Sequence, residues 1–169
     1  MVITLTGFMG CGKSSVGRIL AEKLGWDFTD LDRYIEHKKG ISIPDIFERE
    51  GEDAFRALEA EAFRDNLIMS RIEGRDLVLA LGGGTLGITT IRPMILEKTS
   101  CVYLKTSPAT LRERLSGSEG RPLLKTGSIE DLLEKRSPLY EQAPYIVETD
   151  GRTPEEIAEA ISGTLRQSR

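Results

Sequence analysis

The sequence predicts an α/β protein, a three-layer α/β/α sandwich around a five-stranded parallel sheet. Short apolar runs alternate with longer stretches of helical periodicity, which is the pattern of βαβ units. The apolar runs carry β-branched or aromatic residues, as strands covered on both faces do. The chain has 169 residues, about the size of one domain, and it contains no internal repeat and no linker between domains.

The elements follow from these patterns in chain order. The chain has the signals of helix starts at Ser107-Pro108 and at Thr153-Pro154, and Glu156 completes a capping box with Thr153. Strands are expected at residues 2–6, 27–30, 77–81, 101–105 and 145–148, and helices at 13–24 and about 52–70.

Composition excludes several classes of function. The net charge is −4 with acids and bases interleaved, so no basic stripe indicates binding to nucleic acid. The longest strongly apolar run, residues 77–81, is far too short to cross a bilayer. A strand pattern already begins at residue 2, so we expect no signal or transit peptide ahead of it.

The two cysteines, Cys11 and Cys101, are expected in a reduced cytoplasmic protein, where both serve as small packing residues. A redox role is the alternative. No long exposed apolar stripe is evident, and we expect a monomer.

The stretch "GFMGCGKS" at residues 7–14 fits the pattern G-x-x-x-x-G-K-[ST]. Glycines let backbone N–H groups approach phosphate oxygens, and the following helix directs its positive dipole end at them. Lys13 adds a charge that can follow the β- and γ-phosphates, and Ser14 offers a hydroxyl to Mg²⁺. The sequence therefore predicts a P-loop NTPase fold. The expected nucleotide contacts in the loop are Gly10, Cys11, Gly12, Lys13, Ser14 and Ser15.

Asp30 and Asp32 in "FTDLD" lie at the carboxyl end of a predicted strand, where ligands bind in parallel sheets. One carboxylate can hold Mg²⁺ through its waters, and the other can accept a proton from a hydroxyl nucleophile. A helix N-cap followed by an acid in the first turn is the alternative for this pair.

Gly82, Gly83 and Gly84 follow the next apolar strand. Three glycines form either a tight turn or a surface of bare N–H groups that can bind a polar small molecule. A later Gly- and Ser-rich segment, residues 116–128, is either a plain surface connection or a lid, and its length favours a lid.

With these residues, the whole chain resembles the shikimate kinase family of nucleoside-monophosphate-kinase-like P-loop proteins. The resemblance rests on "GFMGCGKSSVG", "DLD", "FRALE", "LGGGT", "GRPLL" and "KRSPLY" in this order. It implies a single kinase domain over residues 1–169, with a mobile lid at about 112–127 and a substrate-binding helical segment at about 32–70.

The resemblance also implies the role of each matching residue. Asp30 and Ser14 would hold Mg²⁺, Asp32 would bind substrate hydroxyls and act as the base, and Lys13 and Arg121 would be catalytic through the charge that they place on the γ-phosphate. The expected substrate residues are Asp32, Phe47, Arg56, Glu59, Gly82, Gly83, Gly84 and Arg136, and the expected adenine residues are Arg114 and Arg152. Within the first set, Arg56 and Arg136 would clamp the shikimate carboxylate and Glu59 would orient Arg56.

Spacing alone leaves plainer alternatives for the two arginines. Arg56 and Glu59 can form an ordinary i,i+3 pair on a helix surface, and Arg136 can simply close a helix.

The resemblance implies ATP-dependent phosphorylation of the 3-hydroxyl of shikimate, a step of aromatic amino-acid (chorismate) biosynthesis, with Mg²⁺ as cofactor. ATP and shikimate would be the small-molecule partners, with no nucleic acid and no membrane. The alternatives are a kinase for another small polyol acid such as gluconate, a nucleoside-monophosphate kinase and a P-loop regulatory ATPase.

Overall fold

Five parallel strands form one sheet in the computed structural model, which describes residues 1–116 and 128–167. The strands are β1 (Val2–Thr6), β2 (Asp27–Asp30), β3 (Leu77–Ala80), β4 (Ser100–Lys105) and β5 (Tyr145–Glu148). Their order in the sheet is β2-β3-β1-β4-β5. The expected five strands and their parallel arrangement are therefore confirmed.

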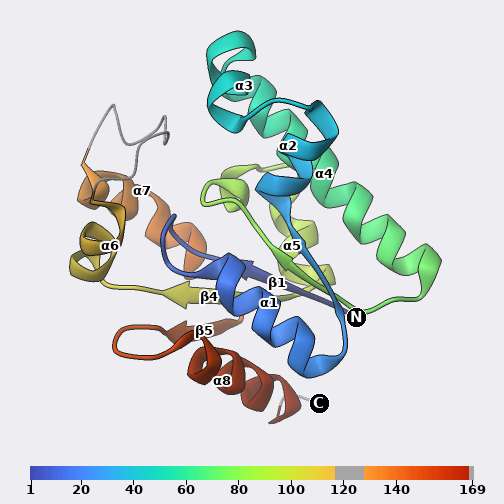
Figure 1. Cartoon of the computed structure of the whole chain (residues 1–169), viewed down its shortest axis with the longest axis vertical. Coiled ribbons are helices and arrows are strands. Elements are labelled where there is room, and N and C mark those ends of the chain that lie inside the picture. The colour runs from blue at the N-terminus through green and yellow to red at the C-terminus, as the bar shows by residue number, and fades with distance from the viewer. Residues whose placement is uncertain (117–127, 168–169) are drawn as a thin grey trace.

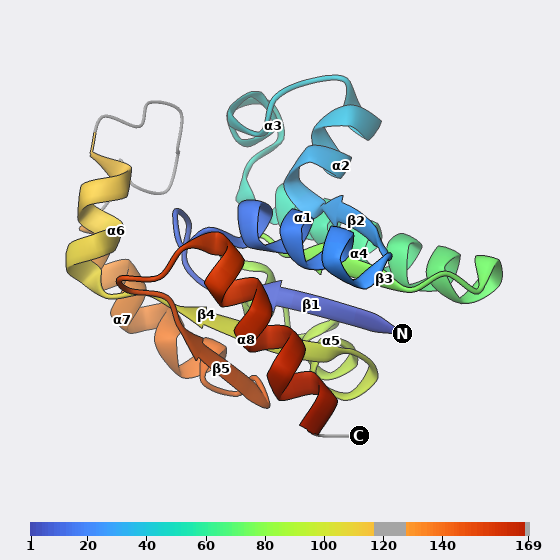
Figure 2. The same ribbon diagram turned by 60° about the horizontal axis from the view of Figure 1, so that its bottom comes forward.

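Helices cover both faces of this sheet, as the sandwich prediction requires (Figures 1 and 2). They are α1 (Lys13–Leu24), α2 (Leu31–Lys39), α3 (Ile43–Glu50), α4 (Glu52–Glu73), α5 (Arg92–Lys98), α6 (Pro108–Leu115), α7 (Ile129–Tyr140) and α8 (Pro154–Gln167), with a 3₁₀ turn, η1 (Thr85–Gly87). Helices α1 and α8 pack together on one face, and α5 and α7 lie on the other (Figure 2). Helices α2 and α3 and the first half of α4 form a lobe that projects at the top of Figure 1.

Side chains cap the first turns of α6 and α8, as the sequence predicts. The Ser107 hydroxyl accepts the N–H of Thr110 (3.3 Å), which caps α6. The capping box at α8 is complete, because Thr153 N–H donates to Glu156 Oε2 (2.8 Å) and Glu156 N–H donates to Thr153 Oγ1 (3.2 Å). Side chains thus satisfy backbone donors that a helix leaves unpaired at its start.

The sheet order explains which strands are most apolar. Every residue of β1 and β3 is buried, because these strands lie inside the sheet and are covered on both faces. The edge strands β2 and β5 contain exposed positions. The register places Asp30 of β2 beside Ala80 of β3, so both strands deliver the residues that follow them to the same edge of the sheet.

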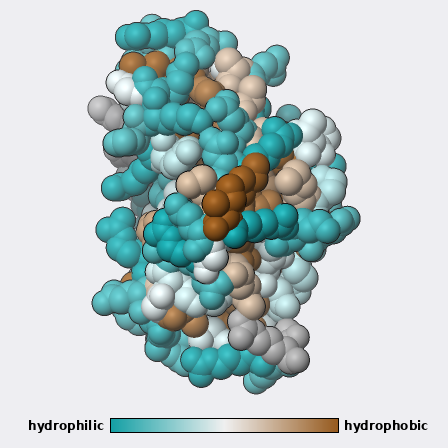
Figure 3. All heavy atoms as spheres, turned by 90° about the vertical axis from the view of Figure 1, so that its right-hand side faces the viewer, coloured by the Kyte–Doolittle hydropathy of each residue, from teal (hydrophilic) through white to brown (hydrophobic). Residues whose placement is uncertain are grey.

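The outer surface is mostly polar on the face shown in Figure 3, which has a compact hydrophobic cluster at its centre. Exposed Ile68, Met69 and Ile72 lie in the last turns of α4. Across residues 1–116 and 128–167, no helix has both the length and the apolar composition that a bilayer-spanning segment needs.

Helix α1 approaches the sheet closely at Gly17, which is buried. A Cβ at this position would lie 2.6 Å from Phe28 Cε2 and 3.2 Å from Leu5 Cδ1, so a side chain would push α1 away from the strands. The glycine-rich loop, which precedes α1 in the stretch at residues 7–14, leads directly into this helix. The contact at Gly17 therefore also fixes the position of the loop relative to the sheet.

Replacing Gly17 with alanine should therefore destabilise the fold, although alanine is the better helix former. We expect the free energy of unfolding to fall by about 1–3 kcal/mol, the usual cost of overpacking, in chemical denaturation. Gly163→Ala in α8 is the matched control, because a Cβ there meets no described atom within 4 Å. That variant should gain about 0.5–1 kcal/mol. Two changes of the same sign would contradict this packing argument.

Candidate functional site

A cavity of about 750 Å³ opens at the carboxyl ends of β1, β2 and β3, between the glycine-rich loop and the lobe of α2, α3 and α4. Its size suits a small-molecule site. All predicted site residues that the structure describes line it, namely Gly10, Cys11, Gly12, Lys13, Ser14, Ser15, Asp30, Asp32, Phe47, Arg56, Glu59, Gly82, Gly83, Gly84, Arg114, Arg136 and Arg152. Arg121, with most of the expected lid, lies outside the described residues.

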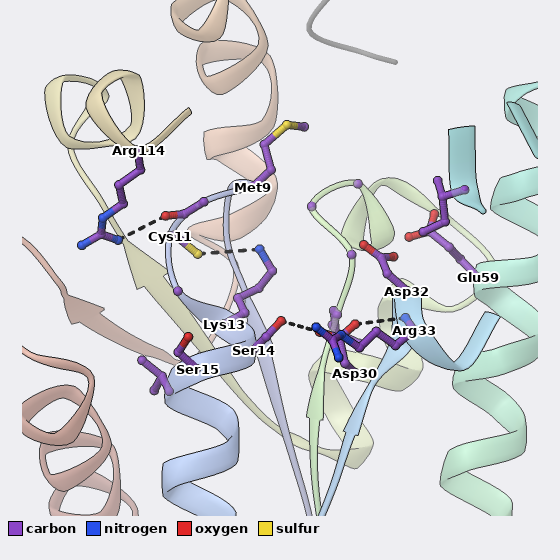
Figure 4. A pocket seen from close by; sticks show the side chains of 18 of the residues that line it. Met9, Cys11, Lys13, Ser14, Ser15, Asp30, Asp32, Arg33, Glu59 and Arg114 are labelled. Atoms are coloured by element: carbon purple, nitrogen blue, oxygen red, sulfur yellow. Dashed lines mark hydrogen bonds between the residues drawn. The ribbon is translucent and has the colours of Figure 1, made fainter. Parts of the chain in front are cut away.

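The glycine-rich loop has the conformation that a phosphate cradle needs. Gly10 and Gly12 have φ values of 81° and 99°, a region that side chains rarely allow. The ammonium of Lys13 reaches back over the loop toward the Cys11 sulfur (Figure 4). It donates to the carbonyl oxygens of Gly7 (2.8 Å) and Phe8 (2.9 Å). Neutral carbonyls thus hold the lysine at a position where an anion can replace them.

Ser14 and Asp30 form a pair of oxygen ligands beside the loop. The Ser14 hydroxyl donates to Asp30 Oδ2, and Asp30 Oδ1 accepts the N–H of Arg33 (3.2 Å) at the start of α2 (Figure 4). Asp30 is therefore the N-cap that the sequence offered as an alternative. One of its oxygens nevertheless faces the loop, so the cap and a ligand position are compatible.

Asp32 lies in the first turn of α2, and its carboxylate is directed into the cavity (Figure 4). Its Oδ1 atom is buried and has no hydrogen-bond partner among the described residues. Burial, followed by the charges of Glu59 and Asp30, raises its pKa from 3.8 to about 6, against the lowering effect of Lys13. Asp32 is thus a carboxylate poised to accept a hydrogen bond or a proton.

Glu59 of α4 is fully buried, which excludes the ordinary surface pair as an explanation of its spacing from Arg56. Arg56 Nη1 donates to Glu59 Oε2, and the Thr85 hydroxyl donates to Glu59 Oε1 (2.7 Å). Arg56 also contacts Glu52 at 3.2 Å and borders the cavity. The carboxylate therefore holds the arginine on the cavity wall.

The three glycines after β3 lie against these charged groups. A Cβ at Gly82 would overlap Glu59 Oε1 and lie 3.0 Å from Asp32 Oδ1. A Cβ at Gly84 would lie 2.5 Å from both terminal nitrogens of Arg56. None of the three glycines has a positive φ, so the segment requires glycine for its small size and not for an unusual backbone.

Arg136 belongs to the interior of α7, which continues to Tyr140, so the idea that this residue closes a helix is wrong. Its side chain is buried, and its guanidinium lies 5.9 Å from the centre of the Phe8 ring. Within the described part of the chain, Nη1 has no hydrogen-bond partner. A Cβ at Gly83 would lie 3.2 Å from that nitrogen, so Arg136 closes the wall beside the glycines.

Arg114 and Arg152 border the other end of the cavity, with the apolar side chain of Ile157. Arg114 Nη1 donates to the carbonyl oxygen of Gly10 (3.1 Å), and Arg152 Nη1 donates to that of Glu148 (3.2 Å). An apolar side chain and two cationic side chains in one cavity suit a flat base attached to phosphates.

Similar proteins identify the family. The profile described as Shikimate kinase matches residues 9–166. The chain belongs to the shikimate kinase family. A shikimate kinase of Thermus thermophilus is 48% identical over 165 residues, which cover 94% of this chain and 86% of the relative. The structure is similar to shikimate kinase from Acinetobacter baumannii in complex with shikimate, with a TM-score of 0.92, 37% identity and coverage of 99% and 94%. A shikimate kinase from Aquifex aeolicus has a TM-score of 0.86, 32% identity and coverage of 99% and 98%.

Reasoning from the family motifs missed two residues that hold the shikimate kinase pocket together. Thr85 follows the glycines and binds Glu59, while Tyr140 closes "KRSPLY" and donates from its hydroxyl to the carbonyl oxygen of Gly83. Both residues stand inside motifs that the sequence singled out. Their partners, however, lie 26 and 57 positions away, and spacing gives no signal for such pairs.

Replacing Asp32 with asparagine should stabilise the protein in the absence of nucleotide and Mg²⁺. The pKa of Asp32 is raised to about 6 in the folded state, so its proton is lost from the unfolded chain first as the pH rises. The native carboxylate therefore destabilises the fold progressively above pH ~4, and the full penalty is present above pH ~6. Asp32→Asn should gain stability on the order of 2–3 kcal/mol across that window.

Urea denaturation of both proteins between pH 4 and 7.5 measures this difference. A difference in unfolding free energy that is the same at pH 4 and at pH 7 would contradict the assigned environment of Asp32.

Proposed function

We propose that this protein transfers the γ-phosphoryl group of ATP to the 3-hydroxyl of shikimate, giving shikimate 3-phosphate and ADP in aromatic amino-acid biosynthesis. The observation that carries the proposal is a pair of unpartnered buried atoms in the cavity of a shikimate kinase family member. Among the described residues, Asp32 Oδ1 is an acceptor without a donor, and Arg136 Nη1 is a donor without an acceptor. A small molecule with a hydroxyl and a carboxylate supplies both missing partners.

Shikimate has this combination of groups on one ring. Its carboxylate would lie between Arg56 and Arg136, because these two arginines border the same cavity next to the triglycine segment, residues 82–84. Its hydroxyls would then face Asp32 and the backbone of Gly82 and Gly83. Two charged contacts far from the reacting hydroxyl orient the ring, so binding energy is used to place the nucleophile.

ATP would bind at the glycine-rich loop, with its phosphates over the N-terminus of α1 and its base between Arg114 and Arg152. Lys13 would leave the carbonyls of Gly7 and Phe8 for phosphate oxygens.

The residues beside the loop fit Mg²⁺, which in such sites takes one or two carboxylates and completes its shell with water and phosphate oxygens. Ser14 and Asp30 offer hard oxygen atoms in direct contact with each other. When bound, Mg²⁺ would neutralise charge on the transferred phosphoryl group. A single carboxylate is therefore sufficient here, and no cluster of three His, Cys, Asp or Glu residues is required.

In the reaction, Asp32 would accept the proton of the attacking hydroxyl. A pKa of about 6 leaves Asp32 mostly ionised near neutral pH and still makes it a better base than an exposed aspartate. Lys13 would offset the negative charge of the phosphoryl oxygens.

On its motif alone, Arg121 remains our candidate for a further contact to the γ-phosphate. The lid and the substrate-binding segment remain proposals in the same way. We also propose that the protein acts as a cytoplasmic monomer.

ADP release from MgATP with different acceptors tests the proposed function. Shikimate should raise the rate far above that without acceptor, while gluconate and nucleoside monophosphates should not. Activity with gluconate alone would retain the kinase and reject the acceptor. Slow release that no acceptor changes would favour a regulatory ATPase instead.

Replacing Asp32 and Arg56 should impair the enzyme in different ways. Asp32→Asn should lower kcat by about 10²–10⁴-fold, the usual contribution of a general base, with the KM for ATP nearly unchanged. Arg56→Lys should instead raise the KM for shikimate about 10- to 100-fold, because lysine cannot replace the forked contact.

Steady-state kinetics with each substrate varied gives both values. Asp27→Asn and Arg75→Lys are matched controls, because these two side chains form an exposed ion pair (2.9 Å) at the opposite end of β2. Equal losses in the controls and in the site variants would count against the assigned roles.

A further inference from the structure

Thr85 is a fully buried residue at the first position of η1, directly after the triglycine segment. Its backbone N–H donates to the carbonyl oxygen of Gly82 (3.2 Å), so the residue turns back over the glycines. Its hydroxyl lies 3.0 Å from the position that a Cβ at Gly82 would occupy and donates to Glu59 Oε1. The hydroxyl therefore lies inside the wall of the acceptor site without lining the cavity itself.

Glu59 depends on this hydroxyl because a fully buried carboxylate is costly unless both oxygens are bonded. One oxygen accepts from Arg56 and the other accepts from Thr85. The carboxylate of Asp32 lies close to the same Cβ position at Gly82 as Glu59 Oε1, and its charge repels that of Glu59. Without the Thr85 hydroxyl, Oε1 would have no described donor, and Glu59 would be driven to rotate.

Arg56 in turn depends on Glu59. Its other ionic contact is Glu52 at 3.2 Å, and the Glu52 side chain is 52% exposed, so that contact holds the guanidinium weakly. Gly84 leaves room behind the guanidinium, but it offers no side chain that could fix it. The orientation of Arg56 therefore follows from the rotamer of Glu59.

We propose that Thr85 is a positioning residue for acceptor recognition: its hydroxyl fixes the Glu59 carboxylate, which holds Arg56 in place to bind the carboxylate of the acceptor. The inference rests on the proposed function, since it needs an acceptor that carries a carboxylate. It assigns Thr85 no contact with ATP, with Mg²⁺ or with the reacting hydroxyl. Its effect is therefore confined to the acceptor side of the reaction.

Thr85→Val tests this role because valine keeps the volume and removes the hydroxyl. We expect the KM for shikimate to rise about 10- to 100-fold, as for loss of a hydrogen bond to a charged group, with the KM for ATP unchanged. Thr85→Ser keeps the hydroxyl and should restore most of the affinity for shikimate. If the valine variant does not fold, Thr85→Ala provides the same comparison.

Thr4→Val is the matched control for loss of a buried threonine hydroxyl. Thr4 is also fully buried, and its hydroxyl pairs with that of Thr99 (2.7 Å), outside the cavity lining. This variant should lose stability and keep both KM values.

A second acceptor separates positioning of Arg56 from general damage. The carboxamide analogue of shikimate lacks the negative charge that Arg56 recognises, so Thr85→Val should reduce kcat/KM for shikimate much more than for the amide. Equal reductions for both acceptors, or an unchanged KM for shikimate, would overturn the inference. Failure of the native protein to phosphorylate shikimate would instead reject the proposed function. The ADP-release assay with the native protein detects that failure before any variant is compared.

Discussion

The acceptor side of the pocket depends on the absence of a side chain at Gly82, because a Cβ there would overlap the Glu59 carboxylate and crowd that of Asp32 at 3.0 Å. The parallel sheet produces this arrangement. Strands β2 and β3 are neighbours and end at the same edge, so α2, which follows β2, and the glycines, which follow β3, meet there. Helix α4 adds Glu59 and Arg56 from the side. Bare backbone is what allows three charged groups to share this space.

The buried charges of the pocket cost stability in the free protein. Asp32 has a raised pKa, and one nitrogen of Arg136 has no partner among the described residues. Both features are unfavourable in the free protein, and under the proposed function they would become favourable when a hydroxyl and a carboxylate bind. Glu59 differs, since its two oxygens are already bonded within the fold. The pocket thus contains both polar atoms without a described hydrogen-bond partner and bonded polar atoms that fix neighbouring side chains.

Much of this could be predicted from the sequence, because the relevant patterns are local. The glycine-rich loop, the N-cap at Asp30 and the capping box at Thr153 each depend on residues a few positions apart. The burial of Glu59 could not be predicted, since it results from η1 packing against α4. The end of α7 could not be predicted from the sequence either. Pro138 usually indicates a helix boundary, because it lacks the N–H that would donate to the carbonyl oxygen four residues earlier, yet the helix continues to Tyr140.

A crystal structure with ADP, Mg²⁺ and shikimate would show how the acceptor is oriented in the pocket. We predict that the shikimate carboxylate lies within hydrogen-bond distance of Arg56 and Arg136. One ring hydroxyl should lie within about 2.6–3.2 Å of the Asp32 carboxylate, on the side that faces the glycine-rich loop. A ring bound in the reverse orientation, with its carboxylate toward Lys13, or bound outside this cavity, would exclude the proposed roles of Arg56, Arg136 and Asp32.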